Sequence, residues 1–177
     1  ACPLNLAPTS STTATLAMGD ALAVACMHAK GFTKEDFARS HPGGALGRRL
    51  LTHVRDVMRT GDAVPCVKED ISVLDAVREI TKKHIGMTAV VNADNVVTGI
   101  FTEGDLRRLI EKRGDIRAIP IAEVMTKTPR TIEADAMAAA VARILEETLV
   151  NQLLVVDKAG HLVGALHLHD LMTAKVI

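Results

Sequence analysis

Thr102 and Asp105 stand three residues apart, where an apolar run that ends at Phe101 gives way to a helical pattern. The start of a helix offers an anion free backbone N–H groups and the positive end of the helix dipole. Arg107 or Arg108, on the same predicted helix, could reach a phosphate bound there. Capping of the helix by the hydroxyl or the carboxylate accounts for the same residue types, so a binding role and a structural role both stay open.

A second segment of the same form carries His167 and Asp170 at these two positions. An imidazole can donate a hydrogen bond to a phosphate, but its charge changes near neutral pH. We therefore expect one competent anion site and one impaired site. A metal site at His167 and His169, with His161 nearby, is an alternative for this segment. No cysteine or well-spaced carboxylate completes a tetrahedral set of ligands, so we predict no metal.

Near the N-terminus, a Ser/Thr cluster that includes Ser10, Ser11 and Thr12 precedes a helix predicted over residues 14–30. Gly31 would end that helix in a left-handed conformation. The cluster is a candidate phosphate-binding or active-site loop, and an ordinary helix cap is the alternative. The side chains of this helix that could be buried are Leu16, Ala23, Cys26 and Met27.

His41 lies in the segment Ser40-His41-Pro42-Gly43-Gly44, which follows a short helix predicted from the capping-box pattern of Thr33 and Asp36. Because His41 precedes a proline, we expect its backbone to be extended. The two glycines would let the backbone approach a ligand or a neighbouring chain closely. Taken alone, a loop histidine can be structural, solvated or catalytic, so its role needs further support.

These candidate sites are carried by an internal repeat. A shift of 65 residues aligns two copies, and the pairs that lead them, Val57-Met58 and Val124-Met125, match after a two-residue slip. Each copy continues with a loop, an amphipathic helix, two short apolar strands around a turn, and a closing helix, which predicts two βαββα units. One unit would leave an apolar sheet face uncovered, so we expect the two to pack face to face and to form clefts.

The predicted core positions follow from periodicity. The helical stripes expected in the core are Val73, Ala76, Val77 and Ile80 in the first copy, and Met137, Ala140, Val141, Ile144 and Leu145 in the second. The predicted strands span residues 88–91, 96–101, 153–156 and 162–166. Aromatic residues make up only 2% of the chain, so the core must be filled by aliphatic side chains and methionine.

Composition narrows the class of protein. Lys plus Arg and Asp plus Glu both total 21, so no net field steers a polyanion, and the absence of Trp and Tyr leaves little material for base stacking. Nucleic acid is therefore not an expected partner. The three cysteines form no CxxC pair, and no apolar run approaches the ~20 residues of a membrane helix. These features favour a cytoplasmic protein without a membrane partner.

The stretch Gly99-Ile100-Phe101-Thr102-Glu103-Gly104-Asp105, with the repeat around it, resembles the signature of cystathionine β-synthase (CBS) domains. The resemblance implies an α/β (α+β) fold, a tandem CBS pair of two βαββα repeats that senses a ligand. It also implies that the hydroxyl and the helix start meet a phosphate and that the carboxylate meets ribose hydroxyls. The ligand-binding residues would be Thr102, Asp105, Arg107, His167 and Asp170, with His167 a departure from the pattern.

The chain before the repeat carries a second resemblance. Residues 6–23, 31–32 and 37–50 are similar to D-arabinose 5-phosphate isomerases, in which a sugar isomerase (SIS) α/β domain precedes a CBS pair. That family interconverts D-ribulose 5-phosphate and D-arabinose 5-phosphate, for synthesis of 3-deoxy-D-manno-octulosonate (Kdo) and lipopolysaccharide. The resemblance implies that His41 matches the active-site histidine, which could move a proton between C1 and C2 or assist ring opening of the phosphosugar substrate.

The family's other active-site residues, a lysine and two glutamates, and its phosphate loop would lie upstream of this sequence. We therefore expect a fragment without isomerase activity, composed of an SIS remnant at residues 1–53 and CBS domains at 54–115 and 121–177. The expected CBS ligand is AMP, ATP or the sugar nucleotide CMP-Kdo, with no cofactor for catalysis, and the expected assembly is a homodimer or homotetramer. The alternative is a stand-alone CBS adaptor that binds an adenine nucleotide and regulates a partner protein.

Overall fold

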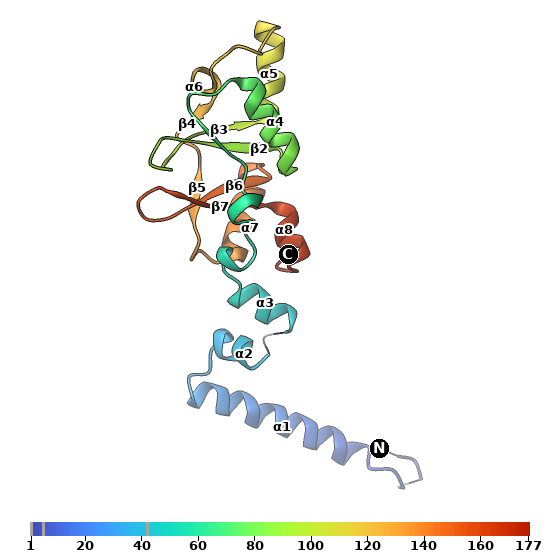
Figure 1. The fold of residues 1–177 in the computed structure, drawn as a ribbon. Helices are drawn as coiled ribbons and strands as arrows, with labels where there is room; N and C mark the ends of the chain where they lie inside the picture. The colour runs from blue at the N-terminus through green and yellow to red at the C-terminus, as the bar shows by residue number, and fades with distance from the viewer. Residues whose placement is uncertain (1, 5, 42) are drawn as a thin grey trace.

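The structure is a computed structural model that describes residues 2–4, 6–41 and 43–177. It has two small α/β units at one end and a string of three helices, α1 to α3, at the other (Figure 1). These helices span Ser10–Ala29, Lys34–Ser40 and Ala45–Leu51. In the described part of the chain, no helix combines the length and the apolar character needed to cross a bilayer.

The first repeat forms a four-stranded sheet in the order β1-β2-β3-β4, with β1 and β2 parallel and the other neighbours antiparallel. Helix α4 begins after Ser72, whose hydroxyl caps its first turn. It buries Val73, Ala76 and Ile80, as the periodicity predicted, and Val77 is half-buried. The elements are the 3₁₀ turns Val54–Asp56 and Gly61–Ala63, β1 Cys66–Lys68, α4 Val73–Lys83, β2 Met87–Val91, β3 Val97–Thr102 and α5 Glu103–Arg113.

The second repeat forms a three-stranded sheet, β5-β6-β7, in which α7, β6 and β7 begin and end 65 residues after α4, β2 and β3. Even an irregularity recurs, because the register shifts between Val90 and Val91 and again between Val155 and Val156. The two βαββα units predicted from the repeat are therefore confirmed. The elements are α6 Ile121–Val124, β4 Thr126–Lys127, β5 Thr131–Glu133, α7 Ala138–Thr148, β6 Gln152–Val156, β7 Leu162–His167 and α8 Leu168–Thr173.

One predicted helical stripe is wrong at two positions. Ala140 is exposed, and Met137 is the half-buried N-cap residue of α7. The helix begins at Ala138, after that cap, and its buried face includes Val141 and Leu145 as predicted, with Ile144 half-buried. The buried residues of α7 are Ala138, Val141, Ala142 and Leu145.

Each repeat sends its leading segment to the other repeat. We call residues 53–59 the first leading segment and residues 121–127 the second. Val54 is buried in the core of the second repeat, and Ile121 is buried in the core of the first. The second leading segment also supplies β4, which pairs with β3 of the first sheet. Each packed unit therefore contains residues from both sequence repeats.

Two glycines make room for this exchange. A Cβ atom at Gly99 would collide with Met125 Sδ, and one at Gly164 would lie 2.6 Å from Met58 Sδ and 2.9 Å from the carbonyl oxygen of Arg59. Both distances are shorter than real Cβ contacts. The same contact is therefore made twice. In each case the methionine of one repeat packs on the glycine in a strand of the other repeat.

The two sheets face each other across an apolar layer, as the uncovered sheet faces predicted. Met87, Ala89 and Val91 on β2 pack there with Leu154 and Ala165 from the second repeat. The two hairpin tips are joined by backbone hydrogen bonds between residues 95–97 and 160–162. Apolar burial between the sheets and hydrogen bonds at the hairpin tips therefore both hold the repeats together.

Helix α1 contains no buried residue. Leu16 is 66% exposed, Met27 is 46% exposed, and Ala23 and Cys26 are exposed as well, so the prediction that they are buried is wrong for this chain. The apolar residues lie around the helix instead of along one stripe, which is the pattern of a helix with partners on several sides. Gly31 follows the helix with a φ of +61°, as predicted.

We predict that Gly164→Ala destabilises the chain by about 1–3 kcal/mol, because the added methyl group forces Met58 and the backbone of Arg59 to move. The control is Gly19→Ala in α1, where the new methyl group meets nothing within 4 Å and should cost no stability. Urea unfolding followed by circular dichroism measures both changes. Equal midpoints for the two variants would contradict the proposed contact.

Candidate functional site

Thr102 closes β3 and is the N-cap residue of α5. Its hydroxyl donates to Asp105 Oδ2 over 2.7 Å and accepts from the backbone N–H of Asp105 over 3.2 Å. Asp105 Oδ2 also accepts from the backbone N–H of Thr102, and Oδ1 accepts from Arg108 Nη2 over 2.6 Å. The two side chains therefore form a capping box, which is the structural role that the sequence left open.

The same capping box lies on the wall of a cleft of about 560 Å³ between the repeats, which we call the first cleft. One wall comes from the end of β3 and the start of α5, and the other from β4, the loop after it and the turn between α7 and β6. The two walls belong to different sequence repeats. The polar residues that line the cleft are Thr102, Asp105, Arg108, Thr126, Thr128, Arg130, Thr148, Asn151 and Gln152.

Two arginines give the first cleft a local positive charge. Arg108 comes from α5 and Arg130 from the loop before β5. The side chain of Arg108 is 65% exposed although it contacts Asp105, so water competes for its guanidinium. Because the chain has no net charge, an anionic ligand depends on local groups such as these.

A neighbouring cleft of about 620 Å³, the central cleft, shares Thr102, Asn151 and Gln152 with the first. Arg107, the arginine predicted for a phosphate, lines the central cleft, where its guanidinium lies 3.8 Å from Glu103. The other titratable residues that line it are His84 and His167. Thr102 and His167, which occupy equivalent places in the repeats, therefore face one continuous polar groove.

Asp170, the counterpart of Asp105, is held by an arginine from the first leading segment. Arg59 donates from Nε to Asp170 Oδ2 over 3.3 Å and from Nη2 to Oδ1 over 3.4 Å. Its remaining nitrogen, Nη1, donates to the carbonyl oxygen of Lys83 over 3.2 Å. The side chains of Arg59 and Asp170 are 25% and 17% exposed, so this ion pair is largely shielded from water.

His167 caps α8 through its ring. Nδ1 accepts from the backbone N–H of His169 over 3.0 Å, so the proton of the neutral ring is on Nε2. Burial lowers the pKa of His167; Asp170 acts against this change and Arg59 adds to it. The imidazole is therefore neutral at neutral pH and brings no positive charge to the groove.

The alternative of a histidine metal site gains no geometric support. His161 lies at the far end of β7 from His167, roughly 20 Å away along six extended residues. Its Nδ1 is 2.9 Å from Asp157 Oδ2, in the hairpin turn. Among the described residues, no group of three or more His, Cys, Asp or Glu side chains is placed to hold a metal ion.

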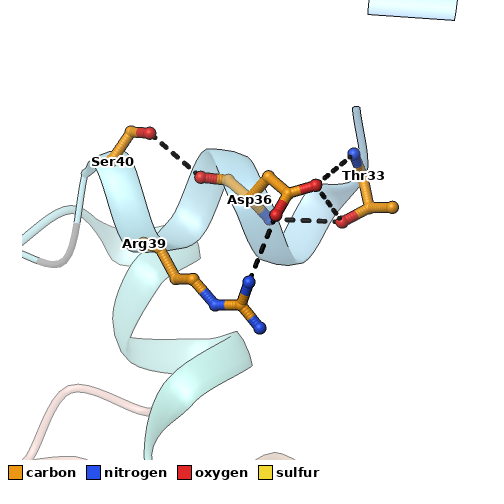
Figure 2. A network of polar contacts seen from close by, with 4 residues as sticks. All are labelled: Thr33, Asp36, Arg39 and Ser40. Carbon is orange, nitrogen blue, oxygen red and sulfur yellow. Dashed lines mark hydrogen bonds and ion pairs between the residues drawn. The ribbon is translucent and has the colours of Figure 1, made fainter. Parts of the chain in front are cut away.

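Figure 2 shows the polar network that starts α2. The carboxylate of Asp36 accepts from the backbone N–H and hydroxyl of Thr33 and from Arg39, over 3.0, 2.9 and 3.2 Å. Hydrogen bonds from Thr33, led by its backbone N–H, lower the pKa of Asp36. Ser40 closes the helix by donating to the carbonyl oxygen of Asp36. The predicted capping box is therefore confirmed, and it fixes the helix that ends before His41.

His41 is exposed and stacks on Phe37, with ring centroids 4.5 Å apart. Its φ of −132° and ψ of 57° are not the extended conformation that was predicted. The reason is that its N–H still donates to the carbonyl oxygens of Phe37 and Ala38, which keeps the backbone close to the last turn of α2. Pro42, on which the prediction rested, lies outside the described residues.

Ser10, Ser11 and Thr12 form the first turn of α1, four residues before the predicted start of that helix, and so do not form a loop. The hydroxyl of Thr12 donates to the carbonyl oxygen of Pro8, and no side chain caps the helix. A helix of 20 residues is roughly 30 Å long, and His41 comes after its far end. Helix α2, which ends before His41, lies beside the end of α1 that is farther from the N-terminus (Figure 1), so the structure does not bring these residues together with His41.

Sequence reasoning missed Thr126 and Arg130, which line the first cleft, and Arg59, which pairs with Asp170. Arg59 and Thr126 follow the two Val-Met pairs directly, and those pairs had already been aligned. That alignment held the signal that Arg59 stands where the other copy has a threonine. The exchange of leading segments places Arg59 and Thr126 against the opposite sheets, and this exchange has no sequence signature of its own.

Residues 54–112 and 121–177 match the family model of the CBS domain. The chain belongs to the CBS-domain family, and its two repeats form a tandem CBS pair. It is 50% identical over all 177 residues to the arabinose 5-phosphate isomerase KdsD of Escherichia coli and 51% identical to that of Pseudomonas aeruginosa. The chain covers 54% of each of these relatives, about half their length. The predicted resemblance to arabinose 5-phosphate isomerases is confirmed.

Solved structures support the same assignment. The structure of CBSX2 in complex with AMP is 26% identical, with a TM-score of 0.59, covering 69% of this chain and 94% of that one. The CBS-domain protein ATU1752 of Agrobacterium tumefaciens is 26% identical, with a TM-score of 0.62, covering 70% and 93%. The CBS pair of protein MJ0100, in complex with 5-methylthioadenosine and S-adenosyl-L-methionine, is 22% identical over 69% of this chain and 94% of its own, with a TM-score of 0.62, and shows the same fold.

We predict that His167 makes the chain less stable as the pH falls. Because its pKa is lower in the folded chain than in the unfolded chain, the unfolded state binds the proton more tightly. The contribution is fully present above the unfolded pKa of about 6.5 and is lost as the pH falls through the lowered folded value. His167→Thr, which does not titrate and can still cap α8, should lose less stability than the wild type between about pH 7.5 and 5.

Urea unfolding at a series of pH values measures this difference, and His169→Gln, at an exposed neighbour, is the control. Parallel pH profiles for the wild type and His167→Thr would show that burial does not lower the pKa of His167.

Proposed function

We propose that this chain is the regulatory CBS pair of an arabinose 5-phosphate isomerase and that it binds a nucleotide or sugar nucleotide in the first cleft. The observation that carries this proposal is the Thr102–Asp105 capping box on the wall of a cleft lined by Arg108 and Arg130. A volume of about 560 Å³ is in the range of small-molecule sites. The crystallised complex of CBSX2 with AMP makes an adenine nucleotide the first candidate.

The charges of the first cleft suit a phosphorylated ligand. The phosphate would lie near the N-terminus of α5, where the helix dipole is positive, with Arg108 or Arg130 as the counter-charge. Asp105 would accept hydrogen bonds from ribose hydroxyls. In this structure its carboxylate is satisfied by Thr102 and Arg108, so ligand binding would replace the exposed Arg108 contact and leave the partly buried cap intact.

The catalytic part of the proposal concerns the whole isomerase. We infer that the parent protein interconverts D-ribulose 5-phosphate and D-arabinose 5-phosphate in the Kdo pathway, with His41 as one acid–base group. The basis is 50% identity over all 177 residues, a span that contains His41. The exposed apolar surface of α1 would be covered by the rest of a sugar isomerase domain in a homodimer or homotetramer. The effector would then be a nucleotide such as AMP or ATP, or CMP-Kdo, a sugar nucleotide formed later in the same pathway.

We predict that Asp105→Asn weakens binding of the effector by about tenfold or more, because a carboxylate accepts stronger hydrogen bonds than an amide. Isothermal titration calorimetry with AMP, ATP and CMP-Kdo would first identify the effector. Asp75→Asn is a matched control: Asp75 forms the same kind of cap with Ser72 and the same pairing with an arginine three residues on, at the start of α4. No binding of any of the three compounds, or equal losses in the two variants, would contradict the proposal.

We predict no turnover of D-arabinose 5-phosphate by the 177-residue chain alone. His41 is exposed, and Ser10, Ser11 and Thr12 lie at the opposite end of α1, so the described residues do not assemble a closed active site. An assay for ribulose 5-phosphate, with a complete arabinose 5-phosphate isomerase as the positive control, tests this directly. Turnover that depends on His41 in the purified chain would refute the prediction.

A further inference from the structure

The repeat allows the two ends of the groove to be compared residue by residue. Asp105 and Thr148 line the first cleft and come from different repeats. Their counterparts, 65 positions away, are Asp170 and Lys83. We call the space between these two counterparts the second cleft. The walls of the two clefts therefore lie at equivalent places in the fold, although some of their side chains differ, as at Thr148 and Lys83.

The residue across the gap differs. Thr126 belongs to the second leading segment and lines the first cleft. Its counterpart, after the two-residue slip, is Arg59 in the first leading segment. Both residues pair with the last strand of the opposite sheet at equivalent places, Thr126 with Ile100 and Arg59 with Ala165. A short threonine side chain leaves the first cleft open, whereas the arginine reaches across the second.

The guanidinium of Arg59 joins both walls of the second cleft. Two of its nitrogens contact the carboxylate of Asp170, and the third donates to the carbonyl oxygen of Lys83 over 3.2 Å. All three nitrogens of the side chain therefore have a partner within the protein. The acidic group that a ribose would meet, by analogy with Asp105, is already satisfied by a cation from the same chain.

Arg59 is also held more firmly than the arginine of the first cleft. Its backbone is fixed by two hydrogen bonds with Ala165, of 2.8 and 3.1 Å, and its side chain is 25% exposed. Arg108, the partner of Asp105, is 65% exposed and sits on the same helix as its carboxylate. A ligand can displace Arg108 into water at little cost, but displacing Arg59 would leave Asp170 partly buried and unpaired.

We propose that Arg59 occupies the second cleft as a built-in substitute for a ligand, so that each chain binds one nucleotide, in the first cleft. This residue, more than the exchange of threonine for His167, makes the two clefts unequal. The number of nucleotides bound rests on the proposed function, whereas the closure of the second cleft by Arg59 does not.

The test replaces Arg59 by its counterpart. Arg59→Thr should open the second cleft. The double variant Arg59→Thr/His167→Thr should also give the second cleft a threonine at the place that Thr102 has in the first. Titration calorimetry with AMP should give one nucleotide per chain for the wild type and two for at least one of these variants. Arg55→Thr removes an exposed arginine of the same leading segment, paired with Asp135, and should leave the stoichiometry at one.

The outcomes separate the two proposals. If the wild type binds one AMP and both Arg59 variants also bind one, the closure by Arg59 is wrong and the proposed function stands. If the wild type binds no AMP and an Arg59 variant binds one, the first cleft is not a site for AMP and the closure stands. If no protein binds AMP, a crystal structure of Arg59→Thr decides: an open cavity beside Asp170, similar in size to the first cleft, supports the closure, and a collapsed one overturns it.

Discussion

The structure depends on one contact that is made twice: the methionine of each leading segment rests on a glycine in the opposite sheet. Met58 lies against Gly164 and Met125 against Gly99, in each case too close for any side chain at the glycine position. This contact ties each leading segment to the other repeat, so the pair folds as one body. It also brings the residue after each methionine to the opposite repeat, where Arg59 contacts Asp170 and Thr126 lines the first cleft.

The duplication therefore provides symmetric positions, and single residues at those positions decide what each can do. On one side, Thr126 leaves room in front of the Thr102–Asp105 cap, and two arginines supply positive charge. On the other side, Arg59 fills the equivalent place, and burial keeps His167 neutral. The two repeats can thus differ in the anion binding that we propose although Gly99 and Gly164 make equivalent contacts in both.

The fold could be predicted from the sequence because periodicity and turn residues are local signals. The repeat, the strands, the capping boxes at Thr102 and Thr33 and the left-handed Gly31 all follow from short stretches of chain. The exchange of leading segments could not be predicted, since no local pattern shows which sheet a leading segment joins. The contact of Arg59 with Asp170, 111 positions away, was missed for that reason. Four apolar residues of the helix predicted over residues 14–30 were expected to be buried, but no residue of α1 is buried in this structure.

The central claim is that a nucleotide binds beside Thr102 and Asp105 and not beside Asp170. A crystal structure of this chain with AMP tests it most directly. The account predicts the phosphate near the start of α5, with Arg108 or Arg130 turned toward it, the ribose against Asp105, and the pair between Arg59 and Asp170 intact. AMP bound against Asp170 with Arg59 displaced, while the first cleft stays without ligand, would contradict it.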